Sequence, residues 1–180
     1  MRHKRLYGLS IAERPEVINR REEFGHREID TVVGRKDSKA VLLTLDERST
    51  RFRYIIKITG RSMSAVEEGI KALRKLYGKV FDSVFRSITS DNGSEFASLP
   101  QLLPGLPVYY AHPYSAYERG LNEKQNSLIR RFLPKGSSFD RVSADKILEI
   151  QNWINRLPRK SFAYASPEEL FSAVLLDFAI

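Results

Sequence analysis

The order of the expected secondary-structure elements constrains this chain more than any other sequence feature. Three β-rich segments, at 27–33, 40–46 and 52–58, are separated only by short polar turns. Strands joined by such turns are antiparallel neighbours. Two further β-rich segments, at 84–90 and 107–111, each follow a crossover, which makes them parallel to the first strand. The sequence therefore predicts an α/β fold with a mixed five-stranded sheet flanked by helices.

Apolar residues repeat with helical spacing in the segments between and after these strands. One helix is expected from about residue 62 to Gly78, with a buried stripe made of Met63, Val66, Ile70, Leu73 and Tyr77. A capping box formed by Ser115 and Glu118 predicts a second helix that runs to about Phe132. Two more helices are expected, at 143–156 and from Pro167 onward.

Length and composition fit one domain with an arm. A chain of 180 residues that is 42% hydrophobic can bury a substantial core. Residues 1–26 lack a clear period and are expected to form an amino-terminal arm or linker, and residues 27–180 the core with its carboxy-terminal helices. The absence of cysteine excludes disulfides, thiolate metal sites and thiol nucleophiles. Because neither a membrane span nor a signal peptide is recognisable, we expect a cytoplasmic protein.

The charge is strongly positive and unevenly spread. The formal net charge is +8 and the pI is about 9.8, which favours a polyanionic partner. Residues 119–160 hold ten Lys or Arg against four Asp or Glu, whereas the last twenty residues hold no Lys or Arg. We therefore predict that nucleic acid is bound in this region, by Arg119, Asn126, Arg130, Arg131, Lys135, Arg159 and Lys160.

The stretch SITSDNGSEF, residues 87–96, places a carboxylate where a strand stops. Asn92-Gly93 is a strong turn signal, so Asp91 could be no more than the polar opener of that turn. Asp30 lies inside the first strand, and if the two strands are parallel neighbours, both acids reach the carboxyl edge of the sheet. Open α/β sheets bind ligands at that edge. A third acid, Glu123, lies on the polar side of its helix, together with Arg119, Asn126 and Arg130.

Three carboxylates that meet repel one another unless a cation compensates them. Oxygen ligands without His or Cys suit Mg²⁺ or Mn²⁺. Two such ions are a standard device for in-line phosphoryl transfer. If Asp30, Asp91 and Glu123 converge, they are therefore expected to be metal ligands acting on a nucleic-acid backbone; the alternative is that Glu123 is an ordinary glutamate on a solvated helix face.

Four stretches of the chain together resemble a known enzyme family. In order and spacing, GHREIDTVVG, TSDNGSEF, HPYSAYERGLNEKQNSLIRRFLPKG and NRLPRKSFAYASPEELF resemble the catalytic core of bacterial DDE transposases of insertion-sequence family thirty, within the retroviral-integrase-like superfamily. The resemblance covers about residues 20–172. It implies an RNase H-like fold and two-metal-ion DNA strand cleavage and strand transfer, during transposition and DNA integration. It also implies that Asp30, Asp91 and Glu123 are the catalytic acids.

Details of the resemblance support and qualify this assignment. Asp91 and Glu123 are separated by 31 residues, a spacing that such enzymes tolerate. The family's aromatic–Arg–Glu–basic pattern is matched by Tyr117, Arg119, Glu123 and Arg130. Before the first acid, however, this chain has Arg27 and Ile29 where the family pattern has Trp and Gly, so a different packing is expected around Asp30.

The resemblance also implies partners. Transposon ends and target DNA are the expected ligands, without a membrane partner; a homo-oligomer on DNA is compatible with this role, as is association with the nucleoid. We expect the family's amino-terminal helix-turn-helix region to be absent. Two alternatives stay open: a non-catalytic nucleic-acid-binding domain with an RNase H-like fold, and an RNase H-type nuclease, although the latter lacks the helix motif around Glu123.

Several other polar residues have simpler structural interpretations. Asp46 is expected to be hairpin punctuation, and Glu95 to fix the loop after Asp91 by hydrogen bonding. Asn126 either contacts DNA or Glu123, or is solvated. Phe96 and Trp153 are expected in the core.

Overall fold

The computed structural model describes residues 7–112 and 120–178, and at residues 120–123 it describes the helix but not the side chains. The strands are β1 (Leu9–Ser10), β2 (His26–Val33), β3 (Ala40–Glu47), β4 (Arg53–Thr59), β5 (Ser87–Ser90) and β6 (Val108–Tyr110). The α-helices are α1 (Glu16–Asn19), α2 (Met63–Tyr77), α3 (Phe81–Val84), α4 (Leu99–Leu102), α5 (Gly120–Ile129), α6 (Ala144–Arg156) and α7 (Pro167–Leu176). Short 3-10 turns lie at Ile11–Glu13, Gly78–Val80, Ser94–Phe96 and Lys160–Phe162.

The strands form one mixed sheet in the order β1-β6-β5-β2-β3-β4. β2, β3 and β4 are antiparallel neighbours, while β5 runs parallel to β2 and β6 parallel to β5. The predicted mixed sheet is therefore confirmed, but it has six strands in place of five. The additional strand is β1, in which Leu9 pairs with Tyr109 of β6. A two-residue strand carries no periodic sequence signal, so this part of the expected arm gives no sign that it joins the sheet.

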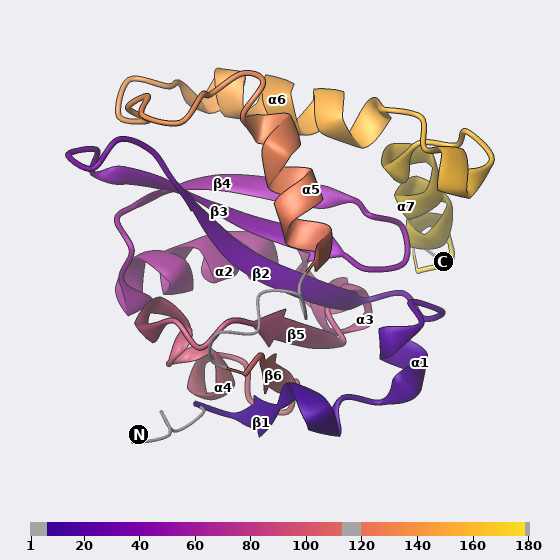
Figure 1. Cartoon of the computed structure of the whole chain (residues 1–180). Coiled ribbons are helices and arrows are strands. Elements are labelled where there is room, and N and C mark those ends of the chain that lie inside the picture. Colours follow the sequence, from indigo (N-terminus) through magenta and orange to yellow (C-terminus); the bar gives the residue numbers. More distant parts are fainter. Residues whose placement is uncertain (1–6, 113–119, 179–180) are drawn as a thin grey trace.

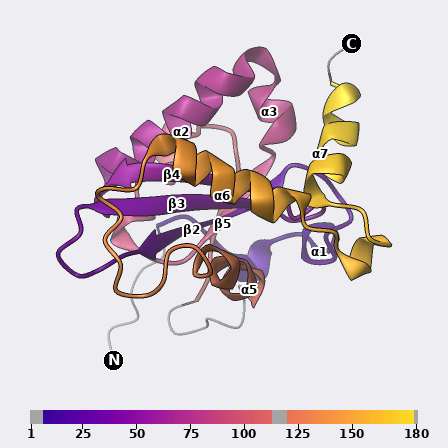
Figure 2. The ribbon, with the colours of Figure 1, turned by 90° about the horizontal axis from the view of Figure 1, so that it is seen from above.

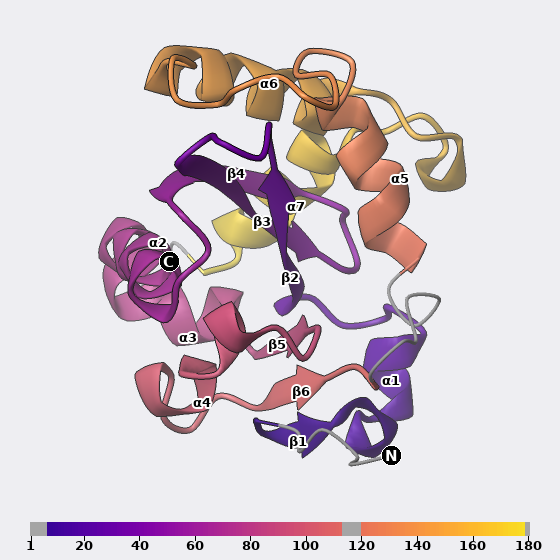
Figure 3. The same cartoon turned by 60° about the vertical axis from the view of Figure 1, so that its left-hand side comes forward.

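Helices cover both faces of the sheet. Figures 1 and 2 show α2 and α3 on one face and α5 on the other, and Figure 3 shows α6 lying across the β4 end of the sheet. The alternation of side chains along β3 explains how the two faces are filled. Leu43 and Leu45 belong to the core beneath α2, whereas Leu42 packs on the opposite side with Ile129 of α5 and Ile150 of α6. Sequence alternation thus builds two cores around one sheet.

A close approach of α2 to the sheet depends on a glycine. A Cβ added at Gly69 would lie 2.7 Å from Cδ2 of Leu43, which is far inside van der Waals contact. The absence of a side chain at Gly69 lets the helix backbone pack against the side chains of Leu43 and Ile58. The predicted helix over about 62–78 is confirmed, with the Ser62 side chain accepting a hydrogen bond from the Ala65 N–H as its N-cap.

The strand β5 starts later in the chain than the sequence predicts. Val84, expected in a strand, is instead the last residue of α3, and β5 begins at Ser87. Phe81 and Phe85 explain the helical turn, because their buried rings stack with centroids 4.4 Å apart, and side chains four residues apart are neighbours on a helix. The expected capping box at Ser115 and Glu118 lies outside the described residues.

The outer edge of β4 is closed by side-chain amides of α6. Asn155 accepts from the Arg53 N–H at 2.8 Å and donates to the Arg53 carbonyl at 2.9 Å, and Gln151 accepts from the Ile55 N–H at 2.8 Å. Farther along, Lys57 donates to two carbonyls of the loop before α6, those of Asp140 and Val142. These bonds take the place of a further strand and fix α6 against the sheet.

A fully buried ion pair lies between β3 and β4. Asp46 and Arg53 face each other in the strand register, and the guanidinium donates from Nε at 2.7 Å and from Nη2 at 2.5 Å to the two carboxylate oxygens. Both side chains are inaccessible to solvent. The expectation that Asp46 is hairpin punctuation is therefore wrong, because β3 continues to Glu47 and the carboxylate points into the protein.

In the described part of the chain, no helix is long and apolar enough to cross a membrane.

We predict that Asp46→Asn lowers the free energy of unfolding by about 3–5 kcal/mol, because it leaves the buried Arg53 charge without its anion. Denaturant unfolding followed by circular dichroism measures the loss. The matched control is Glu168→Gln, which breaks the surface pair with Arg156 (Nε to Oε2, 2.9 Å) and should cost less than about 1 kcal/mol. Equal losses in the two variants would contradict the assignment.

The buried His26 is expected to make the folded protein less stable in acid. Burial holds the pKa of His26 below its ordinary value, although a hydrogen bond to Glu23 opposes that shift. The unfolded chain therefore takes up this proton at higher pH than the folded protein, so the contribution to stability is complete above about pH 6.5 and is lost as the pH falls below it. His26→Gln should flatten the dependence of the unfolding free energy on pH between pH 7 and pH 5.5, as measured by denaturant titration at each pH; an unchanged dependence would contradict this role of His26.

Candidate active site

Asp30 lies in β2, and Asp91 directly follows β5, the parallel neighbour of β2. The β2–β5 register pairs Arg27 with Ile88 and Glu28 with Thr89, so continuing it by two residues brings Asp30 level with Asp91. Neighbouring strands lie about 4.8 Å apart. Strand alternation also puts both acids on the same face, because Ile29 and Ile88 belong to the core on the other face. The sequence therefore predicted correctly that the two acids reach one edge of the sheet.

The loop after β5 holds Asp91 in a compact polar turn. Its Oδ1 accepts the backbone N–H of Gly93 at 2.9 Å. A Cβ at Gly93 would lie 2.8 Å from this oxygen and 2.7 Å from Oε2 of Glu95, so only glycine leaves room for the two carboxylates. Glu95 is buried and accepts hydrogen bonds from Thr31 and Arg61, which confirms its expected role in fixing the loop.

The polar stripe of α5 faces this edge of the sheet. The Asn126 Nδ2 donates to Oδ2 of Asp30 at 3.1 Å, and the Asn126 Oδ1 accepts from Nη1 of Arg53 at 3.0 Å. Because a guanidinium can only donate, Arg53 fixes which end of the amide points at Asp30. The Thr31 N–H donates to the other oxygen of Asp30 at 2.9 Å. Asn126 is therefore half-buried in the protein and holds Asp30 in place.

Glu123 occupies a position on α5 three residues before Asn126. Positions three apart lie on the same face of a helix, so position 123 is on the same face of α5 as Asn126, the residue that contacts Asp30. Its side chain lies outside the described residues, as does the whole of Arg119. Within the described part of the chain, no group of three or more His, Asp or Glu forms a metal site.

The described residues nevertheless fit a hard divalent cation. Asp30 and Asp91 supply only oxygen donors, they share one face at one level of the sheet, and Gly93 leaves open the space that a Cβ would fill. Magnesium or manganese would be held by these two carboxylates, with Glu123 as the expected third ligand.

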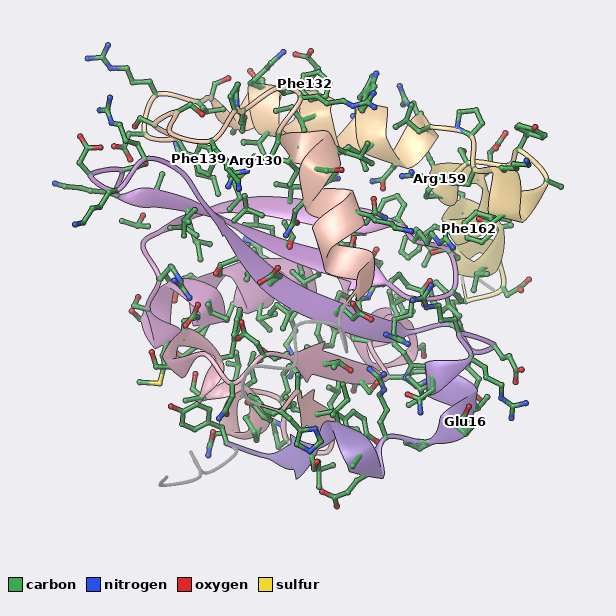
Figure 4. The ribbon with its side chains drawn as sticks, in the orientation of Figure 1. Glu16, Arg130, Phe132, Phe139, Arg159 and Phe162 are labelled. Atoms are coloured by element: carbon green, nitrogen blue, oxygen red, sulfur yellow. The ribbon has the colours of Figure 1, made fainter. Side chains whose placement is uncertain are left out.

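The expected nucleic-acid contacts fall into two groups. Arg131, Lys135 and Lys160 are exposed, although Arg131 also lies over the ring of Trp153. Arg130 and Arg159 are half-buried and contact the protein, and both are labelled in Figure 4. Arg130 donates from Nη2 to the Val33 carbonyl at 2.8 Å, and Arg159 donates from Nη2 to Gln125 at 3.4 Å. Burial lowers the pKa of both groups.

Arg27 sits on the other face of the sheet from Asp30. Its guanidinium carbon lies 4.3 Å from the centroid of Phe85 and 5.4 Å from that of Phe171, and Nη2 donates to the Val84 carbonyl at 3.2 Å. The side chain is fully buried, and burial lowers its pKa. Arg27, where the resemblance led us to expect Trp, therefore packs within the aromatic core beneath β2.

Sequence reasoning missed Arg53, which connects the buried pair to the site. A signal existed: an acid and an arginine at positions 46 and 53 become directly opposed across a hairpin whose turn is centred on Ser49 and Thr50.

Asn126→Asp tests the contact between α5 and Asp30. The variant retains an acceptor for Arg53 but places an anion against Asp30 in place of a donor, so we expect the unfolding free energy to fall by roughly 1–3 kcal/mol without added metal. Denaturant titration measures the change. Asn152→Asp on α6 alters the net charge equally and should stay within about 0.5 kcal/mol of the parent. A loss as large in the control would argue against the contact.

Comparison with known proteins identifies relatives among insertion sequences. The "Probable transposase for insertion-like sequence element IS1161" of Streptococcus salivarius is 42% identical over 169 residues, covering 93% of this chain and 47% of that protein. The transposase for element IS4351 of Bacteroides fragilis is 38% identical over 170 residues, covering 93% and 50%. Transposase InsI for element IS30A of Escherichia coli K12 is 30% identical over 165 residues, covering 91% and 42%. The chain thus spans about half the length of these relatives.

No model of a protein family matches the chain. Among solved structures, a chain of the simian T-cell lymphotropic virus intasome in complex with the PP2A regulatory subunit B56 gamma has a TM-score of 0.59, at 17% identity, covering 81% of this chain and 53% of that one. That similarity confirms the RNase H-like fold expected from the strand order and the resemblance. Over 91–93% of its length, this chain is therefore similar to about half of each of these insertion-sequence transposases.

Proposed function

We propose that this chain is the catalytic core of a transposase that cleaves and joins DNA strands during transposition and integration. One observation carries the proposal: Asp30 and Asp91 share one face at one level of the sheet, beneath the helix that bears Glu123. The relatives support it, because all three named above are described as transposases of insertion sequences.

The protein's contribution is to hold acidic oxygens in fixed positions. Asp30 is oriented by the Thr31 N–H and the Asn126 amide, and Asp91 by the Gly93 N–H. Two bound Mg²⁺ or Mn²⁺ ions would activate the attacking oxygen and stabilise the leaving one. Because both aspartates are set before substrate arrives, little reorganisation is needed at the moment of reaction.

DNA would be held by exposed cations on the same side as α5. Arg131, Lys135 and Lys160 are exposed enough to contact phosphates. Arg130 and Arg159 would contribute mainly by fixing α5 and the loop after α6, because their guanidinium groups already contact protein carbonyl and amide oxygens.

Nicking of supercoiled plasmid DNA in Mn²⁺ tests the catalytic assignment. Glu123→Gln and Asp91→Asn should each abolish nicking while DNA affinity in a gel-shift titration changes less than about threefold, since neither residue is a phosphate contact. Glu149→Gln removes the same charge from an exposed pair with Lys146 and should nick like the parent.

Thermal unfolding supplies an independent readout. Millimolar Mn²⁺ should raise the Tm of the parent and of Glu149→Gln, because a ligand that binds only the folded state stabilises it. The Tm of Asp91→Asn should not respond. Nicking by Glu123→Gln at the parent's rate, or an equal Mn²⁺ response in Asp91→Asn, would refute the proposed site.

A further inference from the structure

A groove opens at the end of the β2–β3 hairpin, between the hairpin and the residues that lead into α2. Its volume is about 700 Å³. Val33 and Val41 line it as apolar residues, and four basic residues surround them: Arg35, Lys36, Lys39 and Arg61. None of these basic residues belongs to the 119–160 region in which the sequence concentrates its positive charge.

The groove adjoins the candidate active site. β2 ends at Val33, three residues after Asp30, so the groove lies at the carboxyl end of β2, with its floor of Val33 and Val41 on the α2 face of the sheet, opposite to the face of Asp30. Arg61 links the two, because its Nε and Nη2 donate to Oε1 of Glu95 at 2.8 and 2.5 Å, and both Glu95 and Asp91 flank Gly93. A strand of DNA that leaves the carboxylates and passes around the end of β2 would meet the groove next. Figure 1 shows the hairpin projecting beyond the sheet at this end.

Two of the four cations are available to a ligand. Arg35 is paired with Asp37 at 2.5 Å, and Arg61 is paired with Glu95. Lys36 and Lys39 are exposed, and neither forms an ion pair within the described part of the chain. The nearby Asp140 is occupied by the Ala40 N–H and the Ser38 hydroxyl. The groove therefore presents two ammonium groups above an apolar floor.

The apolar residues Val33 and Val41 and the ammonium groups of Lys36 and Lys39 together indicate which chemical class of ligand fits the groove. Val33, the last residue of β2, is 44% exposed. Sugar carbons suit such a floor, and phosphates suit the ammonium groups above it. The lining contains no aromatic side chain on which a base could stack. The groove thus fits a sugar–phosphate backbone better than an unpaired base.

We propose that this groove binds the phosphate backbone of the DNA strand that runs out from the catalytic edge. Lys36 and Lys39 contact its phosphates, and Arg61 is a positioning residue that ties the groove to the loop of Asp91. The inference rests on the proposed function for its substrate, but it assigns the backbone path to residues outside the basic 119–160 region.

A charge-matched pair of variants tests the groove. Lys36→Glu/Lys39→Glu should weaken binding to a duplex by more than tenfold at 0.1 M salt, and should reduce the slope of log affinity against log salt by roughly two, because two phosphate contacts are lost. Lys75→Glu/Lys79→Glu changes the net charge equally at exposed positions around the end of α2. It should lower affinity less than about threefold and leave the slope unchanged. Equal losses would overturn the proposal.

Disulfide cross-linking checks the location directly, since the chain contains no cysteine. Lys36→Cys should exchange with a duplex that carries an activated disulfide tethered to a backbone phosphate, and Lys75→Cys should not. Similar yields from both would place the DNA elsewhere.

The Mn²⁺-induced rise in Tm separates this proposal from the proposed function. Lys36→Glu/Lys39→Glu should keep the parent's rise, because these residues are not metal ligands. The parent protein could show neither that rise nor nicking, while Lys36→Glu/Lys39→Glu still binds DNA more weakly than Lys75→Glu/Lys79→Glu. In that case the catalytic assignment fails and the groove stands. If the parent nicks and the groove variant binds like its control, the groove is overturned and the catalytic assignment stands.

Discussion

The candidate active site depends on the hydrogen bonds that the buried guanidinium of Arg53 donates. This guanidinium is paired with Asp46 of β3 and bonded to Asn126 of α5, whose other end holds Asp30. The backbone of the same residue is bonded to Asn155 of α6. One arginine therefore sets two helices against the sheet and fixes the orientation of the amide beside Asp30. A charge this deep requires its side-chain partners, which explains why the polar stripe of α5 contacts Arg53 and Asp30.

The predictable part of this molecule is the part encoded by local periodicity. The alternation in β4 and the helical stripe of α2 were readable, and the β2–β5 crossover was enough to bring Asp30 beside Asp91. Asn126 was harder, because a polar residue on a helix has the same local pattern whether it faces solvent or a buried carboxylate. Its role depends on Arg53, 73 residues away in the chain. The short strand β1 was missed for a related reason, since pairing with β6 alone makes it a strand.

Arg27 illustrates a different limit. Nε and Nη1 of this buried side chain have no hydrogen-bond partner within the described part of the protein, and the guanidinium lies over the faces of neighbouring aromatic rings. Glu47, opposite Arg27 in the strand register, adds a favourable charge. A planar guanidinium stacked on Phe85 occupies the core as a flat aromatic residue would. The carboxylate of Asp30 points to the opposite face of β2, so this replacement lies behind the site and does not enter it.

The amide seal along β4 affects how copies of this chain can meet. An exposed edge strand offers a row of N–H and carbonyl groups, and a neighbouring molecule can extend the sheet by pairing with it. Asn155 and Gln151 already occupy those groups at Arg53 and Ile55. Continuous sheet formation across this boundary would first require α6 to detach. Contacts between copies on this side must therefore be made by helix surfaces and loops, whose side chains can be matched specifically, and not by the indiscriminate backbone pairing that leads to fibrils.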